Sequence, residues 1–480
     1  MRQKSITTNM VLNMVKGAMG VVFPLITFPY ITRVLGVDAI GQYNFAASIV
    51  SYFVLIAGLG ISNYAIRNGA GYRENVLELE TFVSQILTIN ILTTLLSYFL
   101  LLILVAYVDV MDSRAVILVL SLQIVFKTIG VEWLYSVFED YLFITTRSIA
   151  FQVLSLILMF ALVRSQNDIL WYAAITVISS AGTGIVGFFH ARKYCELHLT
   201  RHPNIKKHLK PILLFFATNL TVMIYVNSDT TILGAVSGNY AVGIYSVSVK
   251  VYTLVKSILA SAIVVSIPRM SALWKNKDEV AFQSLGAEIY DIFLTLVIPA
   301  IIGIILLNKE IIMLIAGPDF LDANLSLIIL SVALFFCLGA GFWSQGVMIP
   351  QNRENDVFKI TAVSAIANIV LNFILIPLFQ ERAAALTTVM AEAIVFFYCR
   401  SESTKLLDFG SKKDILLKIL AGCIPMILIN LAIKCLISTQ WIIAVLTVGL
   451  CVPLYFSIEY ILGNTAVVKY KKEIMAKLQR

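Results

Sequence analysis

Charged residues are scarce in this chain of 480 residues. Aspartate, glutamate, lysine and arginine together make up 13% of it, whereas soluble domains average about 25%. Hydrophobic residues make up 59% of the chain, which is more than the core of an ordinary soluble domain can bury. The composition therefore excludes a soluble globular protein and predicts a membrane protein.

Motifs of catalytic and nucleotide-binding sites are absent as well. The sequence contains no G-x-x-x-x-G-K-[ST] loop, no G-x-S-x-G and no H-E-x-x-H, which excludes ATP hydrolysis by this chain. Its six cysteines include no C-x-x-C pair, and its four histidines fall within the basic stretch 190–208. We therefore expect no cofactor, no disulfide framework and no metal site.

Apolar residues occur in long continuous blocks, a pattern typical of membrane-spanning helices and not of a transmembrane β-barrel. About fourteen helices of ~23 residues fit the chain. The predicted spans are 11–32, 40–63, 82–107, 115–138, 142–163, 168–190, 211–234, 242–267, 288–306, 323–349, 357–378, 383–400, 415–435 and 441–462. The connections are too short for a soluble catalytic domain, so the sequence predicts an all-α polytopic membrane protein.

Lysine and arginine gather in every second connection between the predicted spans and in the C-terminal tail. The densest basic runs are 192–210, 269–277, 400–418 and 469–480. Because cytoplasmic loops retain basic residues, we expect these runs and both termini to lie in the cytoplasm. The net charge of +8 then reflects topology and contacts with anionic membrane lipids, and no nucleic-acid partner is expected.

The longest connection, residues 190–210, divides the chain near its middle. A short repeat supports this division, because residues 35–43 resemble residues 233–245: in each, a Leu-Gly pair precedes an [Ile/Val]-Gly-x-Tyr segment, by three residues in the first copy and by seven in the second. Many transporters are built from such internal duplications. The expected parts are an N-terminal lobe (1–210), a C-terminal lobe (211–400) and two additional spans with a basic tail (401–480).

Ionisable residues inside a predicted span are costly, so each is a candidate functional residue. Lys127 and Lys256 lie near the middle of their predicted helices and are the strongest candidates for lining a cavity. Lys16 lies closer to the end of its span, where snorkelling toward the headgroups is an equal alternative. Asp229 and Lys250 lie on consecutive predicted helices, so they could form an ion pair, structural or functional.

Two further charged residues have positions that favour a simpler interpretation. Glu132 follows Lys127 by five residues in the same predicted helix, about 140° around it, so the two need not share a face. Arg147 lies near a helix end and could snorkel toward the headgroups or pair with Glu139 or Asp140. The central charges are mostly basic, which favours an anionic guest such as a phosphate or pyrophosphate, with a carboxylate or an anionic drug as alternatives.

Several groups of residues together resemble one family in their order and spacing. The first group is 23–36 with 40–46, and the second is 132–135 with Glu139, Tyr141 and 147–148. The third is 229–234 with 242–245 and Lys250, and the fourth is 266–271 with 298–299. The fifth lies within 346–392 and includes Pro350, Arg353, Asn372 and Glu392. The pattern resembles bacterial oligosaccharide flippases of the Wzx type, in the multidrug/oligosaccharidyl-lipid/polysaccharide exporter superfamily. Residues 378–385 depart from the family pattern, which typically has a Gly-Ala-x-Gly-Ala-Ala run there.

The resemblance implies a transporter and not an enzyme. Such a flippase translocates undecaprenyl-pyrophosphate-linked oligosaccharide repeat units from the cytoplasmic to the outer leaflet of the bacterial plasma membrane by alternating access, for O-antigen, capsule or exopolysaccharide synthesis. Two six-helix lobes around a central cavity are expected, with a polysaccharide polymerase and a chain-length regulator as partners. Pro24 and Pro29 in the first span are expected bending points.

On this resemblance, roles can be assigned to the charged residues of the spans. The residues expected to bind the pyrophosphate and acidic sugars are Lys16, Lys127, Lys250, Lys256 and Arg269. The residues expected to bind a coupling ion, H⁺ or Na⁺, are Asp229, Glu132 and Glu392.

Three other functions are compatible with many membrane spans. A multidrug antiporter for organic cations should expose acidic residues in its lumen, whereas the central lysines are basic. A polysaccharide polymerase or ligase should carry a large external loop, and the predicted external connections are short. A lipid II flippase would share the fold and the mechanism of a polysaccharide flippase. Only the resemblance of the motifs favours the polysaccharide flippases over the lipid II flippases.

Overall fold

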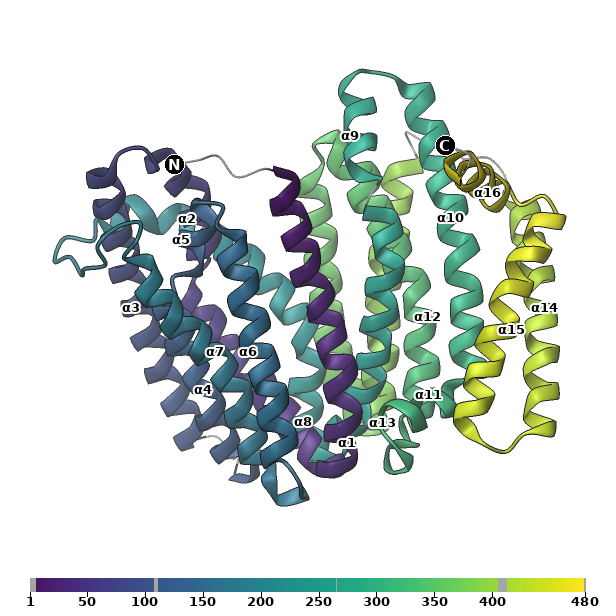
Figure 1. Ribbon diagram of the computed structural model, residues 1–480, viewed down its shortest axis with the longest axis horizontal. Coiled ribbons are helices and arrows are strands. Elements are labelled where there is room, and N and C mark those ends of the chain that lie inside the picture. Colours follow the sequence, from purple (N-terminus) through teal and green to yellow (C-terminus); the bar gives the residue numbers. More distant parts are fainter. Residues whose placement is uncertain (1–5, 108–110, 265, 405–411, 479–480) are drawn as a thin grey trace. The chain divides into compact units, whose positions relative to one another are not determined.

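The described residues of the chain fold into helices. The computed structural model describes residues 6–107, 111–264, 266–404 and 412–478, and in this part it contains helices and no strand (Figure 1). Eleven of the described helices are long and apolar enough to cross a membrane. The predicted class, an all-α polytopic membrane protein, is confirmed.

Three of these helices are long enough to cross twice. α1 (Ile6–Gly58), α8 (Ile205–Val264) and α13 (Glu354–Thr404) contain 53, 60 and 51 residues, whereas one crossing needs about 20. Each has a residue with non-helical backbone angles in its interior: Gly36, Gly238 and Gln380, respectively. Each is therefore a pair of spans joined by a tight turn, so the described part makes fourteen crossings, as the sequence predicts.

The turns in α1 and α8 have the same conformation. Gly36 (φ 76°, ψ −178°) and Gly238 (φ 82°, ψ −177°) adopt positive φ values that residues with a Cβ rarely tolerate. Each begins the pattern Gly-x-x-Ala-[Ile/Val]-Gly-x-Tyr, whose second glycines are Gly41 and Gly243. The predicted repeat is therefore corrected: Gly238, and not Gly234, corresponds to Gly36, and the two copies align without a gap.

Backbone contacts hold the two turns together within the first compact unit of the structure, Met1–Gly243. A Cβ on Gly41 would overlap the Asn239 carbonyl group and lie 2.8 Å from the Gly243 nitrogen. A Cβ on Gly243 would overlap the Val37 carbonyl group in the same way. Val37 and Asn239 each follow a turn glycine, so the contact is reciprocal and both positions require glycine.

Membrane-spanning helices form a bundle in this first unit. Beside α1 and the first half of α8, its long helices are α3 (Val76–Tyr107), α4 (Arg114–Ile129), α6 (Tyr141–Leu162) and α7 (Ile169–Ala191). Figure 1 shows α3, α4, α6 and α7 side by side, with the short helices α2 (Ile61–Gly69) and α5 (Glu132–Val137) at one end. Buried side chains that include Tyr64, Phe82 and Trp133 pack together at that end.

The second compact unit, Ile244–Arg480, has a helix pair attached to its bundle. Its helices after α8 are α9 (Ile267–Lys275), α10 (Glu279–Leu306), α11 (Asn308–Ile315), α12 (Ala323–Gly341), α13, α14 (Lys413–Leu436), α15 (Gln440–Ile461) and α16 (Thr465–Leu478). α12 packs against α13, and the α14–α15 pair packs against α10. The Tyr455 hydroxyl of α15 donates a hydrogen bond to the Thr295 carbonyl oxygen of α10, 2.8 Å away.

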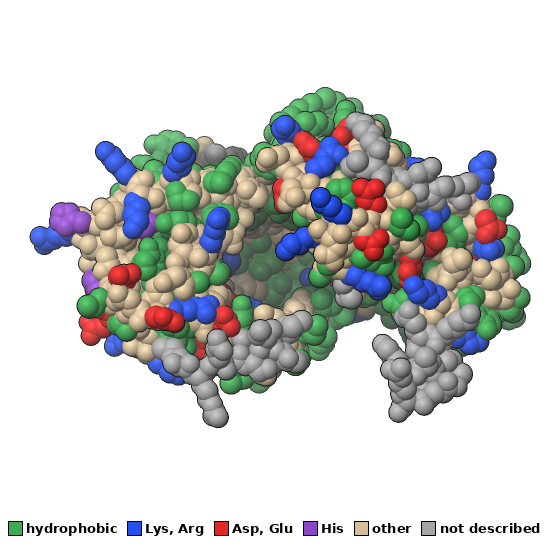
Figure 2. Space-filling model, turned by 90° about the horizontal axis from the view of Figure 1, so that it is seen from above, with side chains coloured by type: hydrophobic (Ala, Val, Ile, Leu, Met, Phe, Trp, Pro, Cys, Tyr) green, Lys and Arg blue, Asp and Glu red, His purple; other side chains and the backbone are tan. Residues whose placement is uncertain are grey.

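Ion pairs join the first half of α10 to α16 and to the residue that precedes α14. Lys412 Nζ lies 2.6 Å from Asp291 Oδ1, and Lys469 Nζ lies 2.6 Å from Glu288 Oε2. Figure 2, which looks onto the end of this unit that carries α16, shows acidic and basic side chains intermingled. Residues 405–411 and 479–480 of the predicted basic runs lie outside the described residues. The predicted lobe boundaries at 210 and 400 stay predictions.

Candidate functional site

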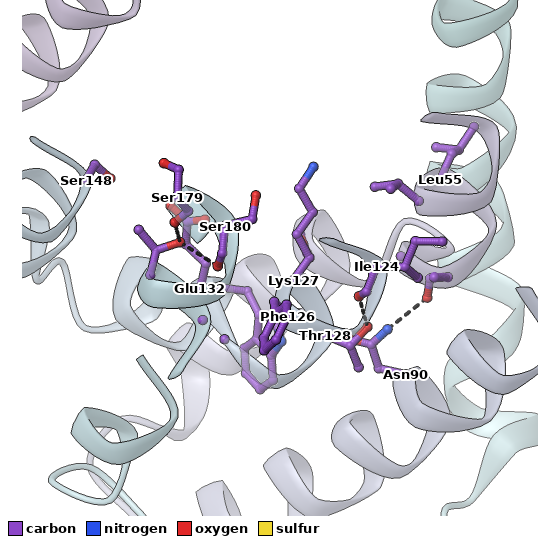
Figure 3. A pocket seen from close by; sticks show the side chains of 18 of the residues that line it. Leu55, Asn90, Ile124, Phe126, Lys127, Thr128, Glu132, Ser148, Ser179 and Ser180 are labelled. Atoms are coloured by element: carbon purple, nitrogen blue, oxygen red, sulfur yellow. Dashed lines mark hydrogen bonds between the residues drawn. The ribbon is translucent and has the colours of Figure 1, made fainter. Parts of the chain in front are cut away.

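A cavity of about 710 Å³ lies among the helices of the first unit. Three basic side chains, Lys16, Lys127 and Arg147, line it together with the acidic Glu132. In Figure 3, the Lys127 side chain extends into the open space of this cavity. The structure thus brings together two residues predicted to bind substrate, one predicted to bind a coupling ion, and Arg147, to which the sequence analysis gave no such role.

A break between α4 and α5 places Lys127 and Glu132 in the same cavity. The predicted continuous helix ends at Ile129, and Val131 adopts a left-handed conformation (φ 37°, ψ 43°) before α5 begins at Glu132. The regular helical rotation between Lys127 and Glu132 therefore does not apply. Lys127 also lies in the last turn of α4, and not near the middle of a helix as predicted.

Lys16 and Glu132 form an ion pair across the cavity wall. Lys16 Nζ of α1 lies 3.0 Å from Glu132 Oε1 of α5, and the two side chains remain 39% and 56% exposed. An ion pair this accessible contributes only about 0–1 kcal/mol, so a competing anion can displace it. Lys127, by contrast, makes no ion pair with any residue that the structure describes.

Arg147 of α6 is buried and does not make the predicted pair with Glu139 or Asp140. Glu139 is 3.0 Å from Arg73 instead, and Asp140 accepts a hydrogen bond of 2.6 Å from the Tyr194 hydroxyl. The Arg147 Nη1 donates a 2.9 Å hydrogen bond to the Thr183 carbonyl oxygen.

Two aromatic rings complete the surroundings of the Arg147 guanidinium. Its central carbon lies 5.3 Å from the ring centre of Tyr135 and 5.0 Å from that of Phe143, within the range of cation–π attraction. The carbonyl and the rings fix the guanidinium at the cavity wall. The sequence signal for this role was the Arg147-Ser148 pair within the family pattern.

Glycine at position 187 of α7 makes room for this guanidinium. A Cβ on Gly187 would lie 2.5 Å from Arg147 Nη1 and 2.8 Å from the Gly130 carbonyl oxygen. The neighbouring Gly184 allows an equally close approach of α7 to the Phe126 carbonyl group of α4. Small residues thus allow the close α4–α7 packing that positions Arg147.

In the second unit, Lys256 and Glu392 come together. Glu392 Oε1 of α13 lies 3.9 Å from Lys256 Nζ of α8, and the Glu392 side chain is only 7% exposed. The Lys256 amine also lies 5.6 Å from the ring centre of Tyr252. One residue predicted to bind substrate and one predicted to bind a coupling ion therefore neutralise each other.

The remaining predicted site residues are separate from these two groups. Arg269 is exposed on α9. Asp229 and Lys250 lie on opposite sides of the Gly238 turn in α8, Asp229 in the first unit and Lys250 in the second. Their predicted ion pair stays a prediction.

The lining of the first unit's cavity favours an anionic ligand. Three positive side chains against one negative side chain leave a surplus of two positive charges. The planar guanidinium of Arg147 matches two phosphate oxygens at once, and the flexible lysines add point charges. This arrangement suits a phosphate or pyrophosphate, and it does not suit an organic cation.

A helical protein with fourteen crossings and a charged cavity among its helices is a multi-pass membrane protein. The family model described as "Polysaccharide biosynthesis protein" matches residues 6–274. The chain belongs to this family. The resemblance to polysaccharide flippases of the Wzx type is thereby confirmed at the level of the family, and the relatives below support a membrane transporter of polysaccharide biosynthesis.

Individual relatives agree with this assignment. Capsular polysaccharide biosynthesis protein CapF of Staphylococcus aureus is 24% identical over 371 residues, which cover 75% of this chain and 90% of CapF. The "Putative O-antigen transporter" of Escherichia coli (strain K12) is 24% identical over 381 residues, covering 78% of this chain and 90% of the relative. The lipid II flippase MurJ in an inward closed conformation has the same fold, with a TM-score of 0.79 at 15% identity over 94% of this chain and 98% of MurJ.

Proposed function

We propose that this protein translocates undecaprenyl-pyrophosphate-linked oligosaccharide repeat units from the cytoplasmic to the outer leaflet of the bacterial plasma membrane, for O-antigen, capsule or exopolysaccharide assembly. The observation that carries the proposal is the surplus of basic side chains in the cavity of the first unit. The pyrophosphate is the part of such a substrate that cannot enter hydrocarbon, and it needs opposite charge along its path. Names of the relatives, a capsular polysaccharide protein and an O-antigen transporter, support the same substrate class.

In the proposed mechanism the pyrophosphate replaces Glu132 as the partner of Lys16. Lys127 has no ionic partner among the described residues and attracts the anion first. Arg147 is already fixed by its hydrogen bond to Thr183, so little side-chain entropy is lost when its remaining N–H groups bind phosphate oxygens. The prenyl tail stays in the lipid while the polar headgroup crosses by alternating access.

Release of Glu132 offers a route for ion coupling. Once Lys16 binds the pyrophosphate, the Glu132 carboxylate is left without its counter-ion and can bind H⁺ or Na⁺. Glu392, buried beside Lys256, and Asp229 are the further proposed ion-binding residues. The residues Lys250, Lys256 and Arg269 remain proposed substrate contacts. Both termini are proposed to lie in the cytoplasm. A polysaccharide polymerase and a chain-length regulator are the proposed partners.

The test determines which leaflet holds the lipid-linked repeat unit, using a membrane-impermeant label on the sugar. We expect labelling from outside in cells with the wild-type gene, and loss of labelling and of surface polymer in the deletion strain. Lys127→Ala and Arg147→Gln should reproduce the deletion, whereas Lys275→Ala, which removes an exposed lysine of α9, should not.

Two outcomes would overturn the proposal. Normal sidedness in the deletion strain together with raised sensitivity to cationic dyes would indicate a multidrug antiporter. Trapping of lipid II in the inner leaflet, with normal sidedness of the repeat unit, would indicate a cell-wall flippase, whose fold this chain shares.

A further inference from the structure

One wall of the first unit's cavity carries polar groups that the protein itself leaves without partners. Ser148 of α6 and Ser179 and Ser180 of α7 line the cavity, and their hydroxyls make no hydrogen bond with any described residue. Gln152, one turn after Ser148, also lines it, and its Oε1 has no partner in the described part. Figure 3 shows Ser148, Ser179 and Ser180 on the same side of the Lys127 side chain.

These hydroxyls differ from others in the same helices. Hydroxyl groups in membrane-spanning helices usually bond back to a carbonyl three or four residues earlier. Thr183 does so with the Ser179 and Ser180 carbonyls at 3.0 and 2.9 Å, and Thr176 does so with Ala173 at 2.7 Å. Hydroxyls that face a cavity and make no hydrogen bond with the residues that the structure describes are free to bind a polar ligand inside it, so this cluster indicates a surface for such a ligand.

The position of this wall beside the cations specifies the ligand. Ser148 directly follows Arg147 in the chain, and Thr183, which accepts the Arg147 hydrogen bond, lies one turn from Ser179 and Ser180. A ligand whose phosphate binds Arg147 therefore presents its adjacent group to the serines. Serine hydroxyls and a glutamine amide both donate and accept hydrogen bonds, which matches the hydroxyls of a sugar.

We propose that Ser148, Gln152, Ser179 and Ser180 form a subsite for the sugar that is attached directly to the pyrophosphate. The inference rests on the proposed function and assigns one part of the substrate to one wall of the cavity. The cavity volume of about 710 Å³ falls within the roughly 300–1,000 Å³ of cavities that enclose small-molecule ligands. The cations bind the charge common to all such substrates, and the polar wall distinguishes among their sugars.

The experiment compares the affinity of the full-length protein in lipid nanodiscs for two kinds of probe. One is farnesyl pyrophosphate, and the other is farnesyl pyrophosphate linked to a single glucose, galactose or N-acetylglucosamine. We expect at least one sugar to strengthen binding by the wild-type protein. The double variant Ser179→Ala/Ser180→Ala should lose that gain, a loss of roughly threefold to tenfold, while its affinity for farnesyl pyrophosphate stays unchanged.

Control variants separate the sugar subsite from the pyrophosphate site. Ser84→Ala removes a serine hydroxyl that is bonded to the Thr81 carbonyl outside the cavity, and it should behave like wild type. Arg147→Gln should weaken the binding of both kinds of probe by the same factor. If the double variant does not fold, Gln152→Leu tests the same wall from α6.

The outcomes distinguish the two proposals. If the wild type binds farnesyl pyrophosphate but no sugar strengthens binding, or if the double variant retains the gain, the subsite is refuted and the pyrophosphate site stands. If the wild type binds neither kind of probe, the proposed function fails and the subsite with it.

Discussion

Replacing Gly187 by alanine should displace the Arg147 guanidinium while the first unit remains folded. The added Cβ would lie 2.5 Å from Arg147 Nη1, whereas ordinary van der Waals contact begins at 3.4 Å, so the guanidinium must withdraw by about 0.9 Å. Its hydrogen bond to the Thr183 carbonyl, 2.9 Å long, is then stretched or broken. The end of a flexible arginine can make this movement, but the Gly130 carbonyl, 2.8 Å from the same Cβ, belongs to backbone and yields less.

Both stability and binding should change by measurable amounts. Crowding of a packed interface by one methyl group typically costs about 1–3 kcal/mol, which sets the expected loss of stability for Gly187→Ala. A displaced charged hydrogen-bond donor costs about 1.5–3 kcal/mol in binding. The affinity for farnesyl pyrophosphate should therefore fall by roughly tenfold to a hundredfold.

The assay measures thermal unfolding and farnesyl pyrophosphate affinity of the purified full-length variant in nanodiscs. Gly17→Ala is the matched control, because Gly17 lies next to Lys16 and a Cβ there meets no atom within 4 Å. Arg147→Gln sets the affinity expected when the guanidinium is absent. If Gly187→Ala binds farnesyl pyrophosphate as tightly as the wild type while Arg147→Gln binds it more weakly, the positioning role of Gly187 is refuted.

Three further predictions follow from other contacts. Glu132→Gln should free its lysine partner and raise the affinity for farnesyl pyrophosphate by a fewfold in the same binding assay, and reduced affinity would contradict the proposed exchange. Gly41→Ala should lower the melting temperature, because its Cβ overlaps backbone, whereas Gly303→Ala, which meets no atom within 4 Å, should preserve or raise it. Burial raises the pKa of the Cys195 thiol to about 12, so at pH 8 maleimide should label the exposed Cys435 and leave Cys195 unmodified until the protein is unfolded in detergent, and labelling of Cys195 in the folded protein would contradict its burial.

Hydrophobic block length was enough to predict the number of membrane crossings, because a bilayer of fixed thickness requires about 20 apolar residues for each crossing. The tight turns were harder to place. The repeat was aligned on Gly234, a helical residue that makes room for the Phe45 ring, whereas the turn lies at Gly238. A Leu-Gly pair in a sequence does not distinguish a glycine needed for its backbone angles from one needed for close packing.

The cavity was predictable only in part, for reasons that the α4–α5 junction makes clear. Sequence spacing assumed one continuous helix and so separated Lys127 from Glu132, but the left-handed Val131 interrupts it. No pattern marks a valine for that conformation, which the surrounding packing imposes. Arg147 was discounted because it lies near a helix end, although burial beside Gly187 turns it toward the cavity wall.

The two units differ in the charge they carry inside the membrane-spanning helices. In the second unit the buried Glu392 compensates Lys256, and in the first unit Glu132 compensates only one of three basic side chains. An uncompensated charge among membrane helices is costly, so a surplus of this kind is best accounted for by a counter-charge supplied by a ligand. The pair in the second unit needs no ligand to be stable, and removal of either partner alone should cost more than removal of both. The charged headgroup should accordingly depend more on the first unit than on the second.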